Sequence, residues 1–263
     1  MIIKCNNTDF QRIKQYISND YAACLYLYMD LIEYGSESDY TTTWIQEEEG
    51  SITCVALSYH TALHIFARDF FNVQEIFNLV VELKPSQICA AKSTLMALKK
   101  PLSTIGYEIE LGFVGKLEYA GQQKSSIILN ATVDDVDDIS KLLYNDEGIG
   151  ASYSLKDLKN QFRERLTDGF VRSYIIKDGD KIVAHLGTGA EVGNVSIITY
   201  VITDPKYRGK GYAKLLYQAA CCDLHKEGKE IYAVYYTDGA VHLHHSVGFV
   251  DICEYGKLFL TMH

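Results

Sequence analysis

The chain has 263 residues, 48% of them hydrophobic and 22% charged, which is the balance of a folded globular protein and excludes a disordered chain. Two domains of ordinary size are expected at this length. The formal net charge of -9 argues against nucleic acid as a partner, because binding a polyanion needs clustered lysine and arginine, and it suits an amine-bearing partner better.

The sequence contains neither the long apolar run of a membrane span nor a secretion signal, so we expect a cytoplasmic protein without a membrane partner. Its 7 cysteines have no regular spacing, which favours reduced thiols over a disulfide framework. His242 and His245 share one helical face, but no carboxylate or cysteine completes a metal-ligand set, and no metal is expected. The oligomeric state cannot be predicted from these features.

The first half alternates apolar strands with amphipathic helix. Residues 52–57 and 64–67 are predicted to pair as a hairpin, residues 73–83 to form a helix and residues 87–90 a short strand. The loop of residues 67–72, between hairpin and helix, contains no glycine. Without glycine the backbone does not easily curl around a phosphate, so this half is not expected to hold a phosphate ligand.

A polar stretch without periodicity, residues 118–126, is interpreted as a linker. We therefore place one domain at residues 1–120 and a second at residues 126–263. In each half a glycine followed by an aromatic residue, at 106–107 and 248–249, precedes Gly-Lys-Leu, at 115–117 and 256–258. This internal echo predicts a tandem of one fold.

The second half begins with a strand and a helix whose start, Thr132-x-x-Asp135, resembles a capping box. Asp178-Gly179 is a strong hairpin signal between two later strands. The predicted elements are, in chain order, a strand at 127–129, a helix to about 144, a helix after 154, strands at 171–176, 182–188 and 195–202, a helix from 211 or 212, a strand at 231–235, a helix at 237–247 and a last strand.

The most informative stretch is residues 200–216, where a buried strand runs through a tight basic loop into a helix. Gly209 and Gly211 let the backbone approach a ligand, and the first N–H groups of the helix have no partner within it. Arg208 and Lys210 add positive charge. A phosphate or pyrophosphate is the expected ligand, and the glycine spacing fits neither a dinucleotide-binding turn nor a nucleotide P-loop.

The pattern Arg208-x-x-Gly211-x-Ala213 resembles the acyl-CoA loop of the GNAT (GCN5-related N-acetyltransferase) superfamily. The helix that closes on Gly248-Phe249 is similar to the family's second motif, and the resemblance covers about residues 126 to 260. Two positions depart from the pattern: Thr237 stands where members often carry asparagine, and His244 where many carry the tyrosine that protonates the departing thiolate.

The resemblance implies an α/β (α+β) fold of tandem GNAT-like domains, each a mixed, mostly antiparallel central sheet flanked by helices, with the first copy degenerate. It implies an N-acetyltransferase that passes an acetyl group from acetyl-CoA directly to a primary amine of a small molecule or peptide. A non-catalytic acyl-CoA-binding sensor or interaction module remains the alternative.

The resemblance also implies the residues of the site. In the family the strand before the loop splays from its neighbour and pairs through its backbone with the pantetheine arm. The implied acetyl-CoA-binding residues are Val201, Ile202, Thr203, Arg208, Gly209, Lys210, Gly211, Tyr212, Ala213, Lys214 and Thr237.

Two side chains are catalytic candidates. His244 is titratable near neutrality and could protonate the thiolate, or simply pack within its helix. The strand before the loop lacks the family's glutamate and has Ser196 near that place, so Glu191 is the nearest substitute for a general base, with His185 on the neighbouring strand. Deprotonation through water, or by no dedicated base, stays open.

Overall fold

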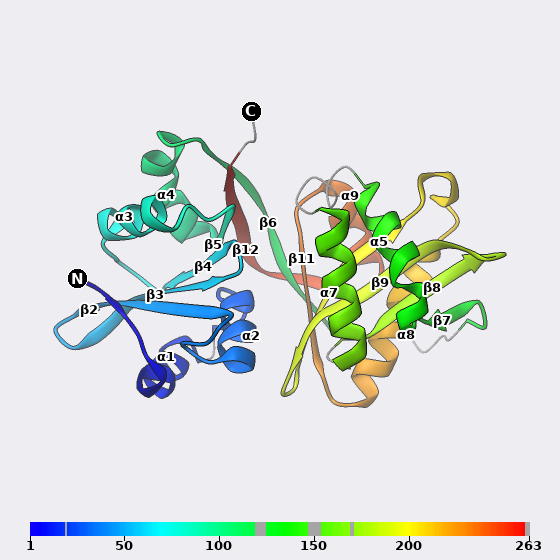
Figure 1. Cartoon of the computed structure of the whole chain (residues 1–263), viewed down its shortest axis with the longest axis horizontal. Coiled ribbons are helices and arrows are strands. Elements are labelled where there is room, and N and C mark those ends of the chain that lie inside the picture. The colour runs from blue at the N-terminus through cyan, green and yellow to red at the C-terminus, as the bar shows by residue number, and fades with distance from the viewer. Residues whose placement is uncertain (19, 119–124, 147–153, 169–170, 261–263) are drawn as a thin grey trace. The chain divides into compact units, whose positions relative to one another are not determined.

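The computed structural model describes residues 1–18, 20–118, 125–146, 154–168 and 171–260 (Figure 1). The chain forms two compact units: Met1–Val114, Tyr235–Thr237 and Asp251–His263 make the first, and Gly115–Val234 with Asp238–Val250 make the second. In the described residues no helix combines the length and apolarity that crossing a bilayer requires.

The first unit is a sheet with helices on both faces. Its strands lie in the order β1-β2-β3-β4-β5-β12, and β6 begins in this unit and ends in the second. The elements are β1 (Ile2–Lys4), α1 (Phe10–Ile17), α2 (Leu25–Tyr34), β2 (Thr41–Glu48), β3 (Ser51–Tyr59), β4 (Ala62–Ala67), α3 (Val73–Leu83), β5 (Gln87–Ala91), α4 (Lys92–Ser103), β6 (Tyr107–Leu117) and β12 (Phe249–Leu260).

Strand β3 shows how alternation builds the two cores of this unit, because successive side chains of a strand point to opposite faces. Cys54 and Ala56 join a buried cluster with the apolar side of α3 and α4. Val55 and Leu57 join another with α1 and α2. The predicted hairpin is confirmed as β3 and β4, which pair antiparallel.

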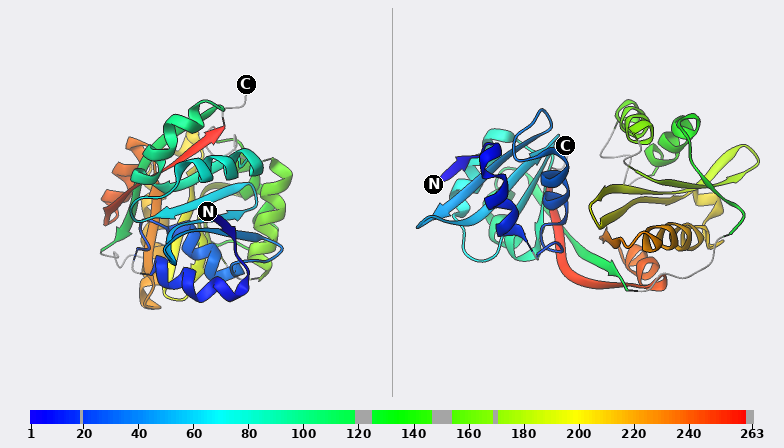
Figure 2. Two further views of the ribbon diagram at one scale, coloured as in Figure 1. Left: turned by 90° about the vertical axis from the view of Figure 1, so that its left-hand side faces the viewer. Right: turned by 90° about the horizontal axis from the view of Figure 1, so that it is seen from below.

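The second unit has the same layering. Its strands lie in the order β11-β10-β9-β8-β7, and Figure 2 shows α5 and α7 on one face of the sheet and α8 on the other. The elements are β7 (Ile128–Asn130), α5 (Val136–Tyr144), α7 (Leu155–Asp168), β8 (Ser173–Asp178), β9 (Lys181–Val192), β10 (Val195–Thr203), α8 (Tyr212–Lys226), β11 (Glu230–Tyr235) and α9 (Asp238–Ser246).

Local signals place the elements of the second unit. Thr132 and Asp135 form the predicted capping box ahead of α5, and Gly179, with a φ of 59°, turns β8 into β9. Ile139 of α5 and Phe162 of α7 then pack on the apolar side of β8 to β10. Among the described strand pairings, β4 with β5 and β10 with β11 are parallel and the others are antiparallel. The predicted mixed, mostly antiparallel fold is confirmed.

The last strand, β12, was expected to complete the sheet of the second GNAT-like copy, but it pairs elsewhere. Its residues Tyr255–Phe259 pair antiparallel with β5 of the first unit, from Ala91 to Gln87. Leu258 lies in the same buried cluster as α3 and α4. The C-terminal strand therefore completes the core of the N-terminal unit.

Candidate acyl-CoA site

The predicted loop leaves β10 through a short 3-10 turn, Pro205–Tyr207, before α8 begins at Tyr212. Gly209 and Gly211 have φ angles of 80° and 79°, in the left-handed region that glycine adopts without strain. A Cβ built on either residue would meet no atom within 4 Å. Both glycines therefore face open space in which a ligand could approach the backbone.

The backbone amides of this loop have no hydrogen-bond acceptor in the part of the chain that the structure describes. Gly211 caps α8 without a side-chain hydrogen bond, and the first helical bond runs from Leu215 N to the Gly211 carbonyl, at 3.1 Å. Among the residues that the structure describes, none accepts a hydrogen bond from the backbone N–H groups of residues 209–214. Such a row of N–H groups at the positive end of a helix dipole is a site for an anion.

Positive charge surrounds these amides. The Arg208 guanidinium donates through Nε to the Thr203 carbonyl at 3.2 Å and lies 3.5 Å from Asp146. The Lys210 ammonium lies 4.6 Å from the centre of the Tyr207 ring. Lys214 is exposed on the first turn of α8. These three basic residues thus lie on the loop itself or on the first turn of α8.

Strands β10 and β11 separate just before the loop. They pair in parallel only from Val195 with Glu230 to Ile198 with Ala233. Beyond Ile198, β10 continues to Thr203, and in the described pairings Ile202 and Thr203 pair with β9 alone. The backbone of that segment is thus turned toward a gap in the ladder, as the family resemblance implies for the pantetheine-binding strand.

Thr237 lies in the connection from β11 to α9, directly before Asp238, the first residue of α9. This connection belongs to the first compact unit, whereas the loop of residues 208–214 belongs to the second. Thr237 is exposed.

The corresponding helix start in the first unit is closed. Asn72 precedes α3, and its side-chain oxygen accepts from the Glu75 N–H at 3.2 Å. The Gln46 side chain binds both the N–H and the carbonyl of Asn72, at 2.9 and 2.8 Å. The Asn72 side chain therefore caps α3 at the Glu75 N–H, and Gln46 holds Asn72 in place. This cap agrees with the absence of glycine from residues 67–72.

His244 is 6% exposed and engaged at both ring nitrogens. The carbonyl of Ala240, which can only accept, lies 2.6 Å from Nδ1, so Nδ1 carries the proton. Nε2 is then the acceptor for the Tyr217 hydroxyl, 2.5 Å away. The rings of Tyr217 and Phe249 pack edge-on against it. In this arrangement the ring has no free proton at Nε2 to donate.

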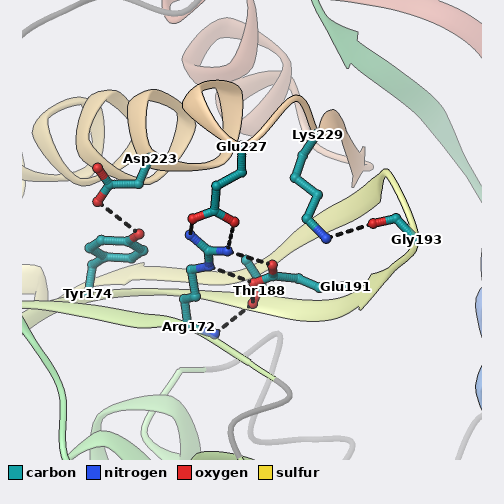
Figure 3. A network of polar contacts seen from close by, with 8 residues as sticks. All are labelled: Arg172, Tyr174, Thr188, Glu191, Gly193, Asp223, Glu227 and Lys229. Carbon is teal, nitrogen blue, oxygen red and sulfur yellow. Dashed lines mark hydrogen bonds and ion pairs between the residues drawn. The ribbon is translucent and has the colours of Figure 1, made fainter.

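Glu191 is tied into an ion-pair network that the sequence does not reveal (Figure 3). Its carboxylate accepts from Arg172 at 3.0 and 3.1 Å and from the Thr188 hydroxyl at 3.0 Å. Glu227 binds the other side of the same guanidinium and raises the pKa of Arg172 above its ordinary value. This placement argues against the predicted general-base role, because the carboxylate is held by a permanent cation.

The network also lies at the C-terminal end of α8, whereas the loop of residues 208–214 lies at its N-terminal end. Glu227 directly follows the 15 residues of α8, and a helix of that length spans roughly 22 Å. A cavity of about 440 Å³ opens beside the network and is lined in part by Leu166, Tyr174 and Lys226. Ser196 is fully buried on β10, and His185 is fully buried on β9.

Comparison with known proteins relates the second half of the chain to one family. Residues 136–249 match the model of the Acetyltransferase (GNAT) family. No curated protein matches the chain. Among solved structures, a Drosophila protein has a TM-score of 0.71 at 12% identity, over 99% of this chain and 98% of that one.

Two further structures extend the similarity. A GCN5-related N-acetyltransferase from Sphaerobacter thermophilus has a TM-score of 0.64 at 15% identity, over 98% of this chain and 94% of that one. A tandem GNAT protein from the clavulanic acid biosynthesis pathway has a TM-score of 0.59 at 9% identity, over 98% and 97%. At these identities the likeness shows the fold, and it includes the first half of the chain, as predicted.

Proposed function

Because residues 136–249 form a GNAT acetyltransferase domain, we propose that the protein transfers the acetyl group of acetyl-CoA to a primary amine of a small molecule or peptide. Both substrates would be bound together, and the acetyl group would pass directly between them. The negative charge of the chain, -9, suits an amine that arrives as a cation.

One observation carries the proposal: within the described residues, the backbone N–H groups of residues 209–214, at the start of α8, have no hydrogen-bond acceptor. A diphosphate offers several acceptor oxygens and two negative charges, which match a row of donors at a helix N-terminus. The open space at Gly209 and Gly211 leaves room for it. The capped start of α3 offers no such match, so we propose one acetyl-CoA per chain.

The remaining binding residues follow from the same arrangement. Arg208, Lys210 and Lys214 would supply charge near the phosphates, with Tyr212 and Ala213 contributing backbone donors. Val201, Ile202 and Thr203 would bind the pantetheine arm through the backbone edge that β11 leaves beyond Ile198. Thr237 would contact the cofactor from the end of β11.

The chemistry then rests mainly on positioning. Attack on a thioester needs a neutral amine and a proton for the leaving thiolate, and a thiol is acidic enough that the second need is modest. Glu191 is bound to Arg172, and His244 accepts from Tyr217. We therefore propose that amine deprotonation runs through water, and that His244 could act only after the Tyr217 hydrogen bond has rearranged.

A non-catalytic acyl-CoA-binding module is the second candidate. The engagement of both predicted catalytic side chains within the protein favours it, since neither is poised for proton transfer. The phosphate-binding loop supports both candidates equally.

Calorimetry with acetyl-CoA, followed by a thiol-release assay over amines, polyamines and peptide N-termini, separates the candidates. Binding with release of CoA supports the enzyme, and binding without release across the panel supports the module. Absence of binding contradicts both. In the same assay His244→Phe tests whether His244 protonates the leaving thiolate. Slower turnover with unchanged acetyl-CoA binding would support that role.

A further inference from the structure

The separation of β10 from β11 coincides with an irregularity in β10 itself. The register of β10 with β9 pairs Thr199 with Gly187 and then Ile202 with His185. Two residues of β10, Tyr200 and Val201, therefore oppose one residue of β9. This is a β-bulge, and a bulge bends the strand that contains it.

The bulge depends on an unfavourable backbone conformation. Tyr200 has a φ of 53°, in the left-handed region that a large aromatic residue seldom adopts. Glycine would adopt this conformation without cost, but the sequence has tyrosine here. A compensating interaction must therefore hold the peptide in place.

His185 supplies that interaction. Its Nδ1 lies 3.0 Å from the Tyr200 carbonyl, and its Nε2 lies 3.1 Å from the Ser173 hydroxyl. Because a carbonyl can only accept, Nδ1 carries the proton and Nε2 accepts from Ser173. His185 is fully buried, and burial lowers its pKa to about 4, so the ring keeps this neutral form at ordinary pH.

The ring is also fixed by packing. Phe162 of α7 lies edge-on to the His185 ring, with centroids 5.6 Å apart, and edge-on to the Tyr200 ring at 5.3 Å. A Cβ at Gly187 would come within 3.2 Å of the imidazole Cε1. Because residue 187 is glycine, there is room for the His185 ring beside the bulge.

The phosphate loop is anchored by a different set of contacts. Asp204 N donates to the Val183 carbonyl at 2.9 Å, and the Asp204 carboxylate binds Lys181 at 2.6 Å. The Tyr207 hydroxyl donates to Asp178 at 2.7 Å. None of these contacts involves His185, so a change at His185 can disturb the bulge and leave the loop in place.

We propose that His185 is a positioning residue for acyl-CoA: it holds the Tyr200 carbonyl, and through it the bulge, so that the backbone of residues 201–203 is presented to the pantetheine arm. This inference rests on the proposed acetyl-CoA site. It assigns His185 no proton transfer and no contact with the acetyl group.

Two ligands distinguish binding of the pantetheine arm from binding of the phosphates. Acetyl-CoA uses both, whereas 3′-phosphoadenosine 5′-diphosphate has the diphosphate and lacks the arm. For His185→Leu we expect acetyl-CoA affinity to fall about 10-fold, and nucleotide affinity to change less than about 2-fold, because only the arm loses its binding edge. His185→Asn, whose amide N–H can replace Nδ1–H, should bind both ligands nearly as the wild type does.

A compensating change provides the strictest test. Tyr200→Gly removes the conformational penalty at residue 200. The double variant His185→Leu/Tyr200→Gly should therefore regain most of the acetyl-CoA affinity, a recovery that is not expected if His185→Leu acts only by disturbing the packing.

Should His185→Leu not fold, Ser173→Ala provides a second test. It removes the hydrogen bond at Nε2 of the ring and is expected to weaken the binding of acetyl-CoA selectively. Equal effects on the two ligands, or none, would overturn the inference. Failure of the wild type to bind either ligand would instead contradict the proposed function.

Discussion

Gly211 and Asn72 occupy equivalent positions in the two units: each directly precedes a helix, α8 or α3, that follows a strand of a parallel pair. The two helix starts differ in how their backbone N–H groups are bonded. Asn72 caps α3 with its own side chain, whereas Gly211 leaves the first amides of α8 to an external acceptor. The two units therefore differ at this helix start: a side chain caps it in the first unit and none does in the second.

Gly211→Asp should raise the acetyl-CoA dissociation constant at least about 10-fold, because a carboxylate beside the loop amides competes with the diphosphate and repels it. Calorimetry measures the effect. Gly228→Asp is a matched control, since Gly228 has a φ of 73° and open space around it but lies beyond the other end of α8. Equal affinity in the two variants would refute the placement of the phosphates.

Asn72→Ala should lower the free energy of unfolding by about 1 kcal/mol, the usual cost of losing an N-cap. Acetyl-CoA affinity and a stoichiometry of one per chain should not change. Chemical denaturation and calorimetry measure the two quantities. Asn72→Asp retains a good capping side chain and should restore the stability; a second acetyl-CoA site in either variant would contradict our account of α3.

Glu191→Gln should reduce stability more than turnover. The substitution removes one carboxylate from Arg172, whose side chain is only 28% exposed, and hydrogen bonds to charged groups contribute about 1.5–3 kcal/mol. Thermal unfolding and the rate at saturating substrates measure the two effects. Glu227→Gln, on the same guanidinium, is the control: if only Glu191→Gln abolishes turnover in a folded protein, Glu191 is a base after all.

Stability should depend on pH through His185. Burial lowers the pKa of His185 from its ordinary value of 6.5 to about 4 in the folded protein, so between these pH values the unfolded chain binds a proton that the folded chain excludes. The contribution is complete above pH 6.5 and is lost as the pH falls toward 4, by roughly 3 kcal/mol. As the pH falls through that window, the unfolding free energy of the wild type should decrease relative to that of His185→Asn, which has no imidazole to protonate. A pH-independent difference would show that the buried ring is not neutral.

The parts of the fold that the sequence predicts are those with local causes. The Asp178-Gly179 turn, the capping box at Thr132 and the glycine loop at 209–211 all form where they were expected, because each is decided by a few adjacent residues. The same locality applies to Asn72, whose loop lacks glycine.

Contacts between distant segments were not predictable. Nothing near Tyr255 shows that β12 pairs with β5, and nothing near Glu191 shows that Arg172 and Glu227 hold it. The bulge was hidden for the same reason, since Tyr200 has no glycine signature and its support comes from His185 on another strand. Side-chain chemistry identified the candidates His244 and Glu191, but their partners decide what each can do.

The pairing of β12 with β5 has a consequence for biosynthesis. During translation the first unit emerges early but lacks a strand of its sheet, because Leu258, an interior residue of its core, is made only after the second unit. The core of the N-terminal unit can therefore be completed only after β12 has left the ribosome. Proteolysis between the halves would not yield two independent proteins, because each fragment would lack chain that its own unit needs: the N-terminal fragment would lack β12, and the C-terminal fragment would lack the end of β6.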